Sequence, residues 1–178
     1  MVTSSSPTST SGRTMASPAR SDVPRPGAWR PTARSRLVGP ALLDTHIWLW
    51  YLDGVRDQIS DAALAMLRRA ARTSGLLVSD ISVWELGTKA SKGKLTLAPS
   101  VSAWLARAEA RPGFAFLPVD RAGLLASAQL AGAIHGNPVD RILIAHAAAG
   151  ALPLVTADRL IVDYAERTRS VSVCDARR

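Results

Sequence analysis

Cysteine and long apolar runs are the features that this 178-residue chain has least of. Its single cysteine, Cys174, excludes an intramolecular disulfide and the cysteine-rich zinc sites. We expect Cys174 to be a small buried residue of the last strand, in a protein suited to a reducing compartment such as the cytoplasm. No apolar run approaches the roughly 20 residues that cross a bilayer, so the sequence predicts a soluble protein.

Acidic residues are scarce at the start of the chain. Residues 1–40 carry six arginines and one acid, and so supply five of the eight net positive charges. Residues 1–39 are rich in Ser, Pro and Arg with little aliphatic periodicity, which predicts a disordered tail. The composition resembles a transit peptide, but its prolines would interrupt an amphipathic helix, and a dispensable tail explains it equally well. The mildly basic remainder is compatible with an RNA partner without requiring one.

Short apolar runs alternate with amphipathic segments from residue 40 onward. The apolar fraction of 47% is ample for a buried core. Strands are expected at 41–43, 76–78, 114–119, 152–156 and 171–173. Helices are expected at about 47–51, between Ser60 and Gly75, and at about 82–90, 101–108, 121–132, 138–149 and 159–165. This alternation predicts one α/β domain over 40–178, with a parallel sheet of about five short strands covered by helices on both faces.

Four acidic residues lie where a strand-like run gives way to a helix-like one: Asp44, Glu85, Asp140 and Asp158. In a strand–helix chain such junctions gather at the carboxyl edge of the sheet, where α/β proteins place their ligand sites. Several carboxylates converging there would repel one another unless a cation lay between them. The set therefore predicts a divalent-metal site and hydrolytic chemistry.

Each acid, taken singly, also has a structural explanation as part of a helix cap. Ser82 and Glu85 have the spacing of a capping box. Residues 137–140 (NPVD) place Asn at the cap, Pro at the first helical position and Asp in the first turn. Asp44 and Asp158 could each cap the helix that follows. Capping does not, however, require acids to recur at the ends of buried strands.

Oxygen ligands without paired His or Cys favour Mg²⁺ or Mn²⁺ over zinc. Such an ion lowers the pKa of a bound water and clamps phosphate oxygens during displacement at phosphorus. Thr156, two residues before Asp158, could contact such a water or a phosphate, or it could be an ordinary satisfied hydroxyl of the strand.

Five segments of the chain, in this order, resemble PIN domains of the VapC-toxin type. They are residues 42–50 (LLDTHIWLW), 78–85 (VSDISVWE), 92–95 (KGKL), 135–141 (HGNPVDR) and 155–158 (VTAD). Any one of these motifs is common, whereas their order and spacing are specific. The resemblance covers about residues 41–175 and excludes the tail.

The resemblance implies a PIN-like nuclease fold and a metal-dependent ribonuclease that cuts RNA with an activated water. Asp44, Glu85, Asp140 and Asp158 match the family's acidic positions. The resemblance also implies a cognate antitoxin, with the chain as a homodimer or in a toxin–antitoxin hetero-oligomer. Asn137 departs from the acid usual at its position; it can still cap the helix or contact a water, but it carries no charge.

Other polar residues near these motifs have both functional and structural interpretations. Arg141 could pair with a carboxylate or a phosphate. His46 is expected to pack or to make a hydrogen bond, and His135 could touch RNA or close a loop. His146 reads as core. Lysines between 89 and 94 could line an RNA path or form a solvated turn.

Two rival functions remain at the level of sequence. Asn137 leaves room for a non-catalytic PIN domain that binds RNA or a protein partner. A receiver-like domain with Asp44 as phosphoacceptor is the second rival, although the paired acids and later lysine of such a site are missing. The aromatic and sulfur side chains of the early helices could form a partner surface or belong to the core: Trp48, Trp50, Tyr51 and Met66.

Overall fold

The structure is a computed structural model that describes residues 39–132, 134 and 136–178. The predicted tail, apart from Gly39, and His135 lie outside the described residues. None of the described helices is both long and apolar enough to cross a membrane.

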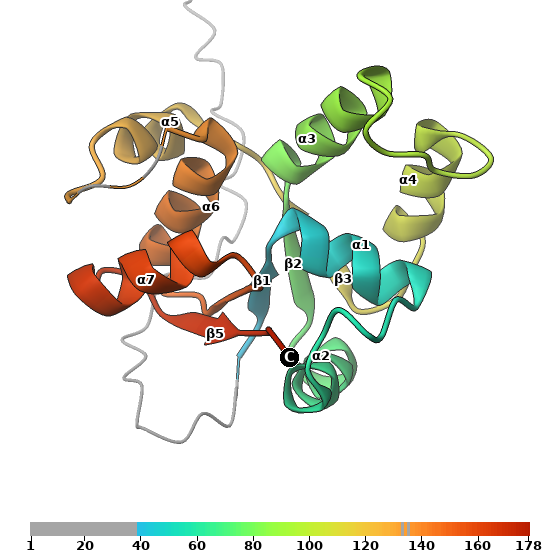
Figure 1. Ribbon diagram of the computed structural model, residues 1–178, viewed down its shortest axis with the longest axis horizontal. Coiled ribbons are helices and arrows are strands. Elements are labelled where there is room, and N and C mark those ends of the chain that lie inside the picture. The colour runs from blue at the N-terminus through green and yellow to red at the C-terminus, as the bar shows by residue number, and fades with distance from the viewer. Residues whose placement is uncertain (1–38, 133, 135) are drawn as a thin grey trace, which may run out of the picture.

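Five short parallel strands form a single sheet, as the sequence predicted. Their order across the sheet is β3-β2-β1-β4-β5, with β1 in the centre (Figure 1). This order differs from the 2-1-3-4-5 order of receiver-like folds, which removes that rival. The strands are β1 (Ala41–Leu43), β2 (Leu76–Ser79), β3 (Phe114–Leu117), β4 (Leu154–Thr156) and β5 (Val173–Asp175).

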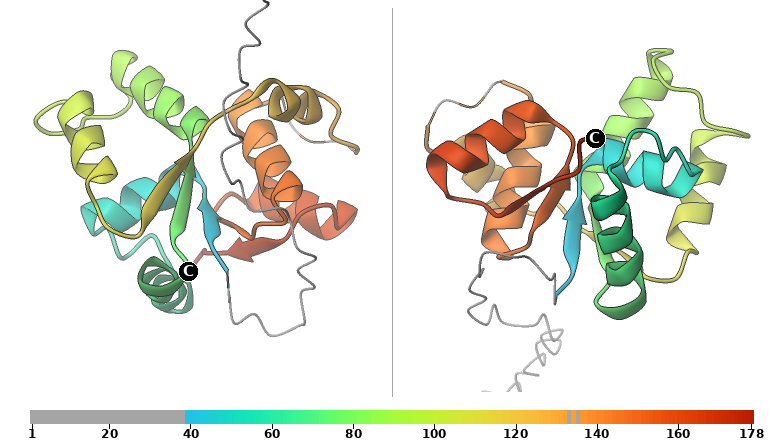
Figure 2. Two further views of the ribbon diagram at one scale, coloured as in Figure 1. Left: turned by 180° about the vertical axis from the view of Figure 1, so that it is seen from behind. Right: turned by 60° about the horizontal axis from the view of Figure 1, so that its bottom comes forward.

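Helices cover both faces of the sheet, and two hydrophobic cores result (Figures 1 and 2). Leu43 faces the core under α1, α2 and α4, whereas its neighbour Leu42 faces the core under α6 and α7, because successive strand residues point to opposite faces. The helices are α1 (Thr45–Asp53), α2 (Asp61–Thr73), α3 (Asp80–Ser91), α4 (Val101–Glu109), α5 (Arg121–Ala128), α6 (Pro138–Ala149) and α7 (Arg159–Thr168).

Two element boundaries differ from the sequence prediction in ways that matter. The last strand begins at Val173 rather than Val171, because Val171 turns into the core beside α7 and Val173 pairs with Leu154. Helix α3 begins at Asp80 rather than Ser82, because the Ser79 hydroxyl accepts the N–H of Ile81 as its cap. Cys174 lies in the last strand as expected, but it is only half-buried.

The order in which successive strands are added to the sheet reverses at the boundary between β1 and β4. From β1 it runs outward through β2 to β3, and it then returns to the other side of β1 for β4 and β5. Ligands of open α/β sheets bind outside the carboxyl ends of the strands at such a switch point. Asp44 directly follows β1, and Asp158 lies two residues after the last residue of β4.

Gly113, just before β3, is expected to be the glycine least tolerant of substitution. A Cβ there would lie 2.3 Å from the backbone oxygen of Ala71, and its φ of +87° disfavours L side chains. Gly113→Ala should lower the free energy of unfolding by several kcal/mol, measured by urea denaturation. Gly54→Ala is the matched control: its φ is +74° with open space around the Cβ, so it should cost only about 1 kcal/mol. Equal losses in the two variants would contradict this packing.

Candidate active site

Asp44 is a buried carboxylate at the carboxyl end of the central strand. Its side chain is 6% exposed, and although Asp44 occupies the cap position of α1 it makes no side-chain cap hydrogen bond. Instead, the Thr156 hydroxyl donates to Asp44 Oδ2 at 2.5 Å, across from β4. Asp44 therefore occupies the cap position without a regular cap hydrogen bond, and its main side-chain contact is with Thr156.

Thr156 joins Asp44 to Asp158. The same Thr156 Oγ1 that donates to Asp44 accepts the backbone N–H of Asp158 at 2.9 Å. Asp158 Oδ1 accepts the N–H of Leu160 at 2.7 Å, which confirms that Asp158 caps α7. The Thr156 hydroxyl both donates a hydrogen bond to Asp44 and accepts one from the backbone of Asp158, and so it fixes the two acids relative to each other.

Glu85 forms a salt bridge with Lys89, which in turn contacts His46 beside Asp44. Its Oε1 lies 3.0 Å from Lys89 Nζ, one turn further along α3. The predicted capping box is wrong, because Ser82 lies inside α3 and its hydroxyl accepts the Thr45 hydroxyl at 2.9 Å. That bond joins the first turn of α1 to α3, next to Asp44.

Lys89 also contacts His46, so that four charged or polar side chains form a chain from Glu85 to Asp44. Lys89 Nζ lies 2.8 Å from His46 Nε2, and His46 Nδ1 lies 4.0 Å from Asp44 Oδ1. An ammonium can only donate, so Nε2 accepts and the imidazole carries its proton on Nδ1, facing Asp44. The expected hydrogen bond of His46 is confirmed.

Asp140 is the second buried acid of the set, at 6% exposure in the first turn of α6. Asn137 caps this helix through the N–H of Val139, as predicted, and its amide nitrogen donates to Asp140 Oδ2 at 2.8 Å. Asn137 therefore orients the carboxylate of Asp140. An aspartate at 137 could not donate this bond unless it were protonated.

Burial is the main influence on Asp44, and it raises the pKa of the carboxyl above its ordinary value of 3.8. The negative charge of Glu85 raises the pKa further, whereas the Thr156 hydrogen bond and His46 lower it. Two carboxylates are thus close enough to oppose each other's ionisation at the edge of the core. A bound cation would relieve this cost.

The raised pKa predicts how stability depends on pH when divalent cations are removed. Because the folded state holds the Asp44 proton more tightly than the unfolded state, this contribution is present at low pH and is lost as pH rises through the folded pKa. In EDTA, the free energy of unfolding of Asp44→Asn relative to the native chain should therefore increase with pH. Urea denaturation over a pH series measures the difference, and parallel curves would contradict the prediction.

The donor chemistry of this edge fits a hard divalent cation. Two buried and two half-buried carboxylates supply oxygen donors, and Thr156 and Asn137 hold three of them in place. Lys89 supplies a positive charge beside Glu85. Within the described ranges, no three His, Cys, Asp or Glu side chains lie close enough together to hold a metal ion.

Several other residues singled out from the sequence make structural contacts of their own. Arg141 donates to the backbone carbonyls of Ser127 and Ala128, and so ties α6 to the end of α5 instead of pairing with a carboxylate. Trp48 is fully buried and cannot belong to a partner surface. His146 is only half-buried and bonds the Ser79 hydroxyl at 3.1 Å.

The architecture and the site together define a doubly wound α/β protein with an acidic centre at its topological switch point. The family model of the PIN domain matches residues 41–167, and the chain belongs to that family. PIN domains are generally nucleases, and PIN-domain nucleases generally depend on divalent metals. None of the proteins with curated functions matches the chain by sequence.

Two solved structures share the fold. A chain of VapBC2 from Rickettsia felis, determined bound to a DNA fragment from their promoter, is 18% identical with a TM-score of 0.57. The alignment covers 77% of this chain and 98% of that one. A chain of FitAcB from Neisseria gonorrhoeae is 23% identical with a TM-score of 0.53, covering 76% of this chain and 96% of that one.

Proposed function

We propose that this chain is an endoribonuclease that hydrolyses RNA phosphodiester bonds with Mg²⁺ or Mn²⁺ as cofactor. The observation that carries the proposal is the buried Asp44 carboxylate at the switch point. It is joined through Thr156 to Asp158 and opposed by the charge of Glu85. Membership of a family whose members are generally nucleases supports this reading.

In the proposed centre, Asp44, Glu85, Asp140 and Asp158 hold the cation. When bound, the cation supplies a water of lowered pKa and neutralises charge on the phosphate oxygens. Thr156 fixes the orientation of Asp44, and Asn137 fixes that of Asp140. Lys89, beside Glu85, offers a positive charge to a phosphate that enters the site.

We further propose that the chain is the toxin of a toxin–antitoxin pair. The sequence motifs resemble the VapC type of PIN domain. The two structural neighbours are chains of the assemblies named VapBC2 and FitAcB. The partner would be a cognate antitoxin, bound to a homodimer or in a hetero-oligomer. Co-expression with a candidate antitoxin, followed by co-purification as a complex, tests this part.

The nuclease proposal is tested by replacing Asp140, one of the two buried acids of the proposed centre. Asp140→Asn keeps the shape of the side chain and its hydrogen bond from Asn137, but removes the charge. Incubated with total cellular RNA and Mg²⁺ or Mn²⁺, the native chain should give discrete fragments and the variant at least about a hundredfold less product.

The remaining rival is a non-catalytic PIN domain. Cleavage and binding experiments with the same RNA distinguish it from the nuclease. Equal fragment yields from the native chain and Asp140→Asn would mean that Asp140 is no ligand. RNA binding indifferent to EDTA, without cleavage by either metal, would establish the binding role instead.

A further inference from the structure

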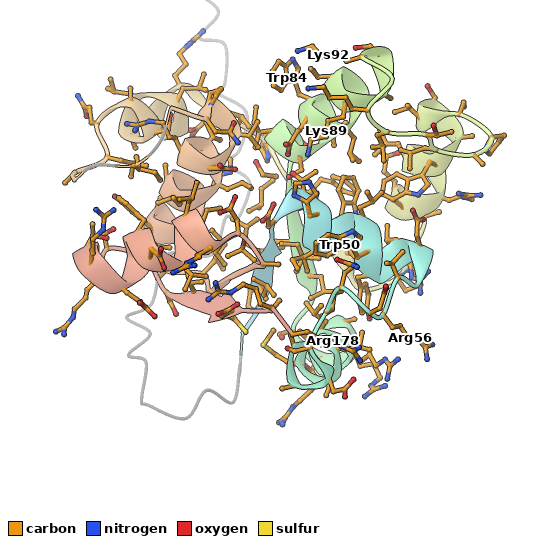
Figure 3. All side chains as sticks on the ribbon, viewed as in Figure 1. Trp50, Arg56, Trp84, Lys89, Lys92 and Arg178 are labelled. Atoms are coloured by element: carbon orange, nitrogen blue, oxygen red, sulfur yellow. The ribbon has the colours of Figure 1, made fainter. Side chains whose placement is uncertain are left out.

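The exposed side of α1 carries a row of aromatic and cationic side chains that begins beside Asp44. The His46 side chain is 47% exposed and lies one turn before Trp50, with ring centroids 5.7 Å apart and planes tilted by 39°. Lys89 reaches this row from α3, at 2.8 Å from His46. Figure 3 shows Lys89 and Trp50 on the same side of the molecule, with Arg56 beyond the far end of α1.

The row continues into a cavity of about 190 Å³ at the far end of α1. Trp50 and Val55 line this cavity together with three arginines, Arg56, Arg68 and Arg111. Among the described residues that line it, none is acidic. Because Trp50 contributes both to the aromatic pair and to the cavity wall, the two features form one continuous surface.

The three arginines come from different parts of the chain and are all exposed. Arg56 follows α1, Arg68 belongs to α2 and Arg111 follows α4. Among the residues that the structure describes, no carboxylate pairs with any of them. Three guanidinium groups around one cavity repel one another, and a polyanion in the cavity would remove that repulsion.

We propose that this surface, the α1 track, binds the single-stranded RNA that flanks the bond cut at the carboxylates. The track consists of Lys89, His46, Trp50, Arg56, Arg68 and Arg111. The inference rests on the proposed nuclease function. The arginines contact phosphates, and an unstacked base lies against the His46–Trp50 pair, which is how proteins bind single strands without reading sequence.

The length of α1 separates the two parts of the track. From Asp44 to Asp53 the helix rises about 13 Å, so the arginine cavity holds phosphates some nucleotides away from the scissile one. A duplex cannot place a base against the His46–Trp50 pair, because its bases are stacked on one another. An acidic protein segment would match the arginines alone, whereas a nucleotide strand supplies both a phosphate and a flat base.

The test measures RNA affinity in a chain that cannot cut. In the full-length Asp140→Asn background with EDTA, a fluorescent single strand of about 12 nucleotides is titrated by anisotropy. Arg68→Ala/Arg111→Ala should weaken binding about tenfold, and reduce the slope of log K against log salt by about 1.4, since each single-strand phosphate contact contributes about 0.7. Trp50→Leu should weaken the single strand about tenfold and leave a duplex unaffected.

Arg169→Asn is a control for the loss of a single positive charge outside the track. Arg169 is exposed at the end of α7, remote from α1 in the chain, and its φ of 53° suits asparagine. This variant should bind RNA as the parent does. Unchanged affinity and slope in the double arginine variant would overturn the track, and so would an equal loss of affinity for polyglutamate.

The experiments distinguish an error in the RNA-binding proposal from an error in the nuclease proposal. Because the titration needs neither metal nor cleavage, it supports or overturns the track even if the native chain cuts nothing. If the native chain cuts the same strand but the double arginine variant keeps its KM, the nuclease stands and the track is overturned.

Discussion

Asp44→Asn is expected to lower the rate of RNA cleavage by at least about a thousandfold. Loss of a carboxylate that holds the cation removes several kcal/mol of transition-state stabilisation, and about 4 kcal/mol corresponds to three orders of magnitude. The asparagine retains an oxygen that accepts the Thr156 hydroxyl, so the local structure should persist. Initial rates on a defined RNA with saturating Mn²⁺ measure the effect.

Asp163→Asn is the control for Asp44→Asn. Asp163 is a surface acid of α7, half-exposed and paired with Arg159 at 3.6 Å, so its loss should leave the rate within about twofold. In metal-free buffer, Asp44→Asn should also be at least as stable as the native chain at high pH, because it removes the cost of ionising a buried carboxyl group. A fully active Asp44→Asn protein would mean that the reaction takes place elsewhere.

Thr156→Val is expected to reduce cleavage by about 10–100-fold, the range typical of residues that orient metal ligands. Valine preserves the shape of threonine but removes the one hydroxyl that contacts both Asp44 and the backbone of Asp158. It also leaves a buried carboxylate oxygen without this hydrogen bond, which should cost about 1–3 kcal/mol of folding stability.

Thr156→Ser separates the hydroxyl from the methyl group. Serine keeps both hydrogen bonds and loses only a methyl group from a fully buried position. Cleavage should therefore stay close to the native rate in Thr156→Ser, even though stability falls somewhat. If the serine and valine variants lost activity to the same degree, packing rather than the hydroxyl would be the cause.

The features that sequence predicted correctly are local ones. Alternation of apolar runs with helical stripes predicted the parallel sheet, and the acids that follow β1 and β4 were found from their position alone. The cap at Asn137 was likewise readable, because its proline and aspartate neighbours fit the first turn of a helix. These features depend on residues within a few positions of one another.

The features that sequence missed depend on residues far apart in the chain. The sequence prediction began α3 at Ser82, whereas Ser79 caps the helix and Ser82 accepts the hydroxyl of Thr45. Thr45 and Ser82 are 37 residues apart, so their contact is visible only in three dimensions. The contact of Lys89 with His46 spans 43 residues. Only the Glu85–Lys89 half of that network was readable, from its i,i+4 spacing on a helix.

Arg141 shows how neighbours in sequence separate on a helix. It follows Asp140 directly, but adjacent helical residues point about 100° apart, so Arg141 reaches the end of α5 while Asp140 is buried in the first turn of α6. In the described residues two backbone carbonyls take the place of the carboxylate partner inferred for Arg141, whereas the alternative phosphate contact stays a prediction. Asn137, at a spacing of three residues, does lie on the same side as Asp140 and contacts it.

Removal and restoration of the metal tests the central claim most directly. The full-length chain, freed of divalent ions with EDTA and dialysed, is mixed with total cellular RNA, and Mg²⁺ or Mn²⁺ is then added back in steps. We predict no cleavage without the ion, and discrete fragments whose yield rises and saturates with its concentration. RNA fragmentation that persists unchanged in EDTA, or none at any concentration of either ion from a folded chain, would contradict the account.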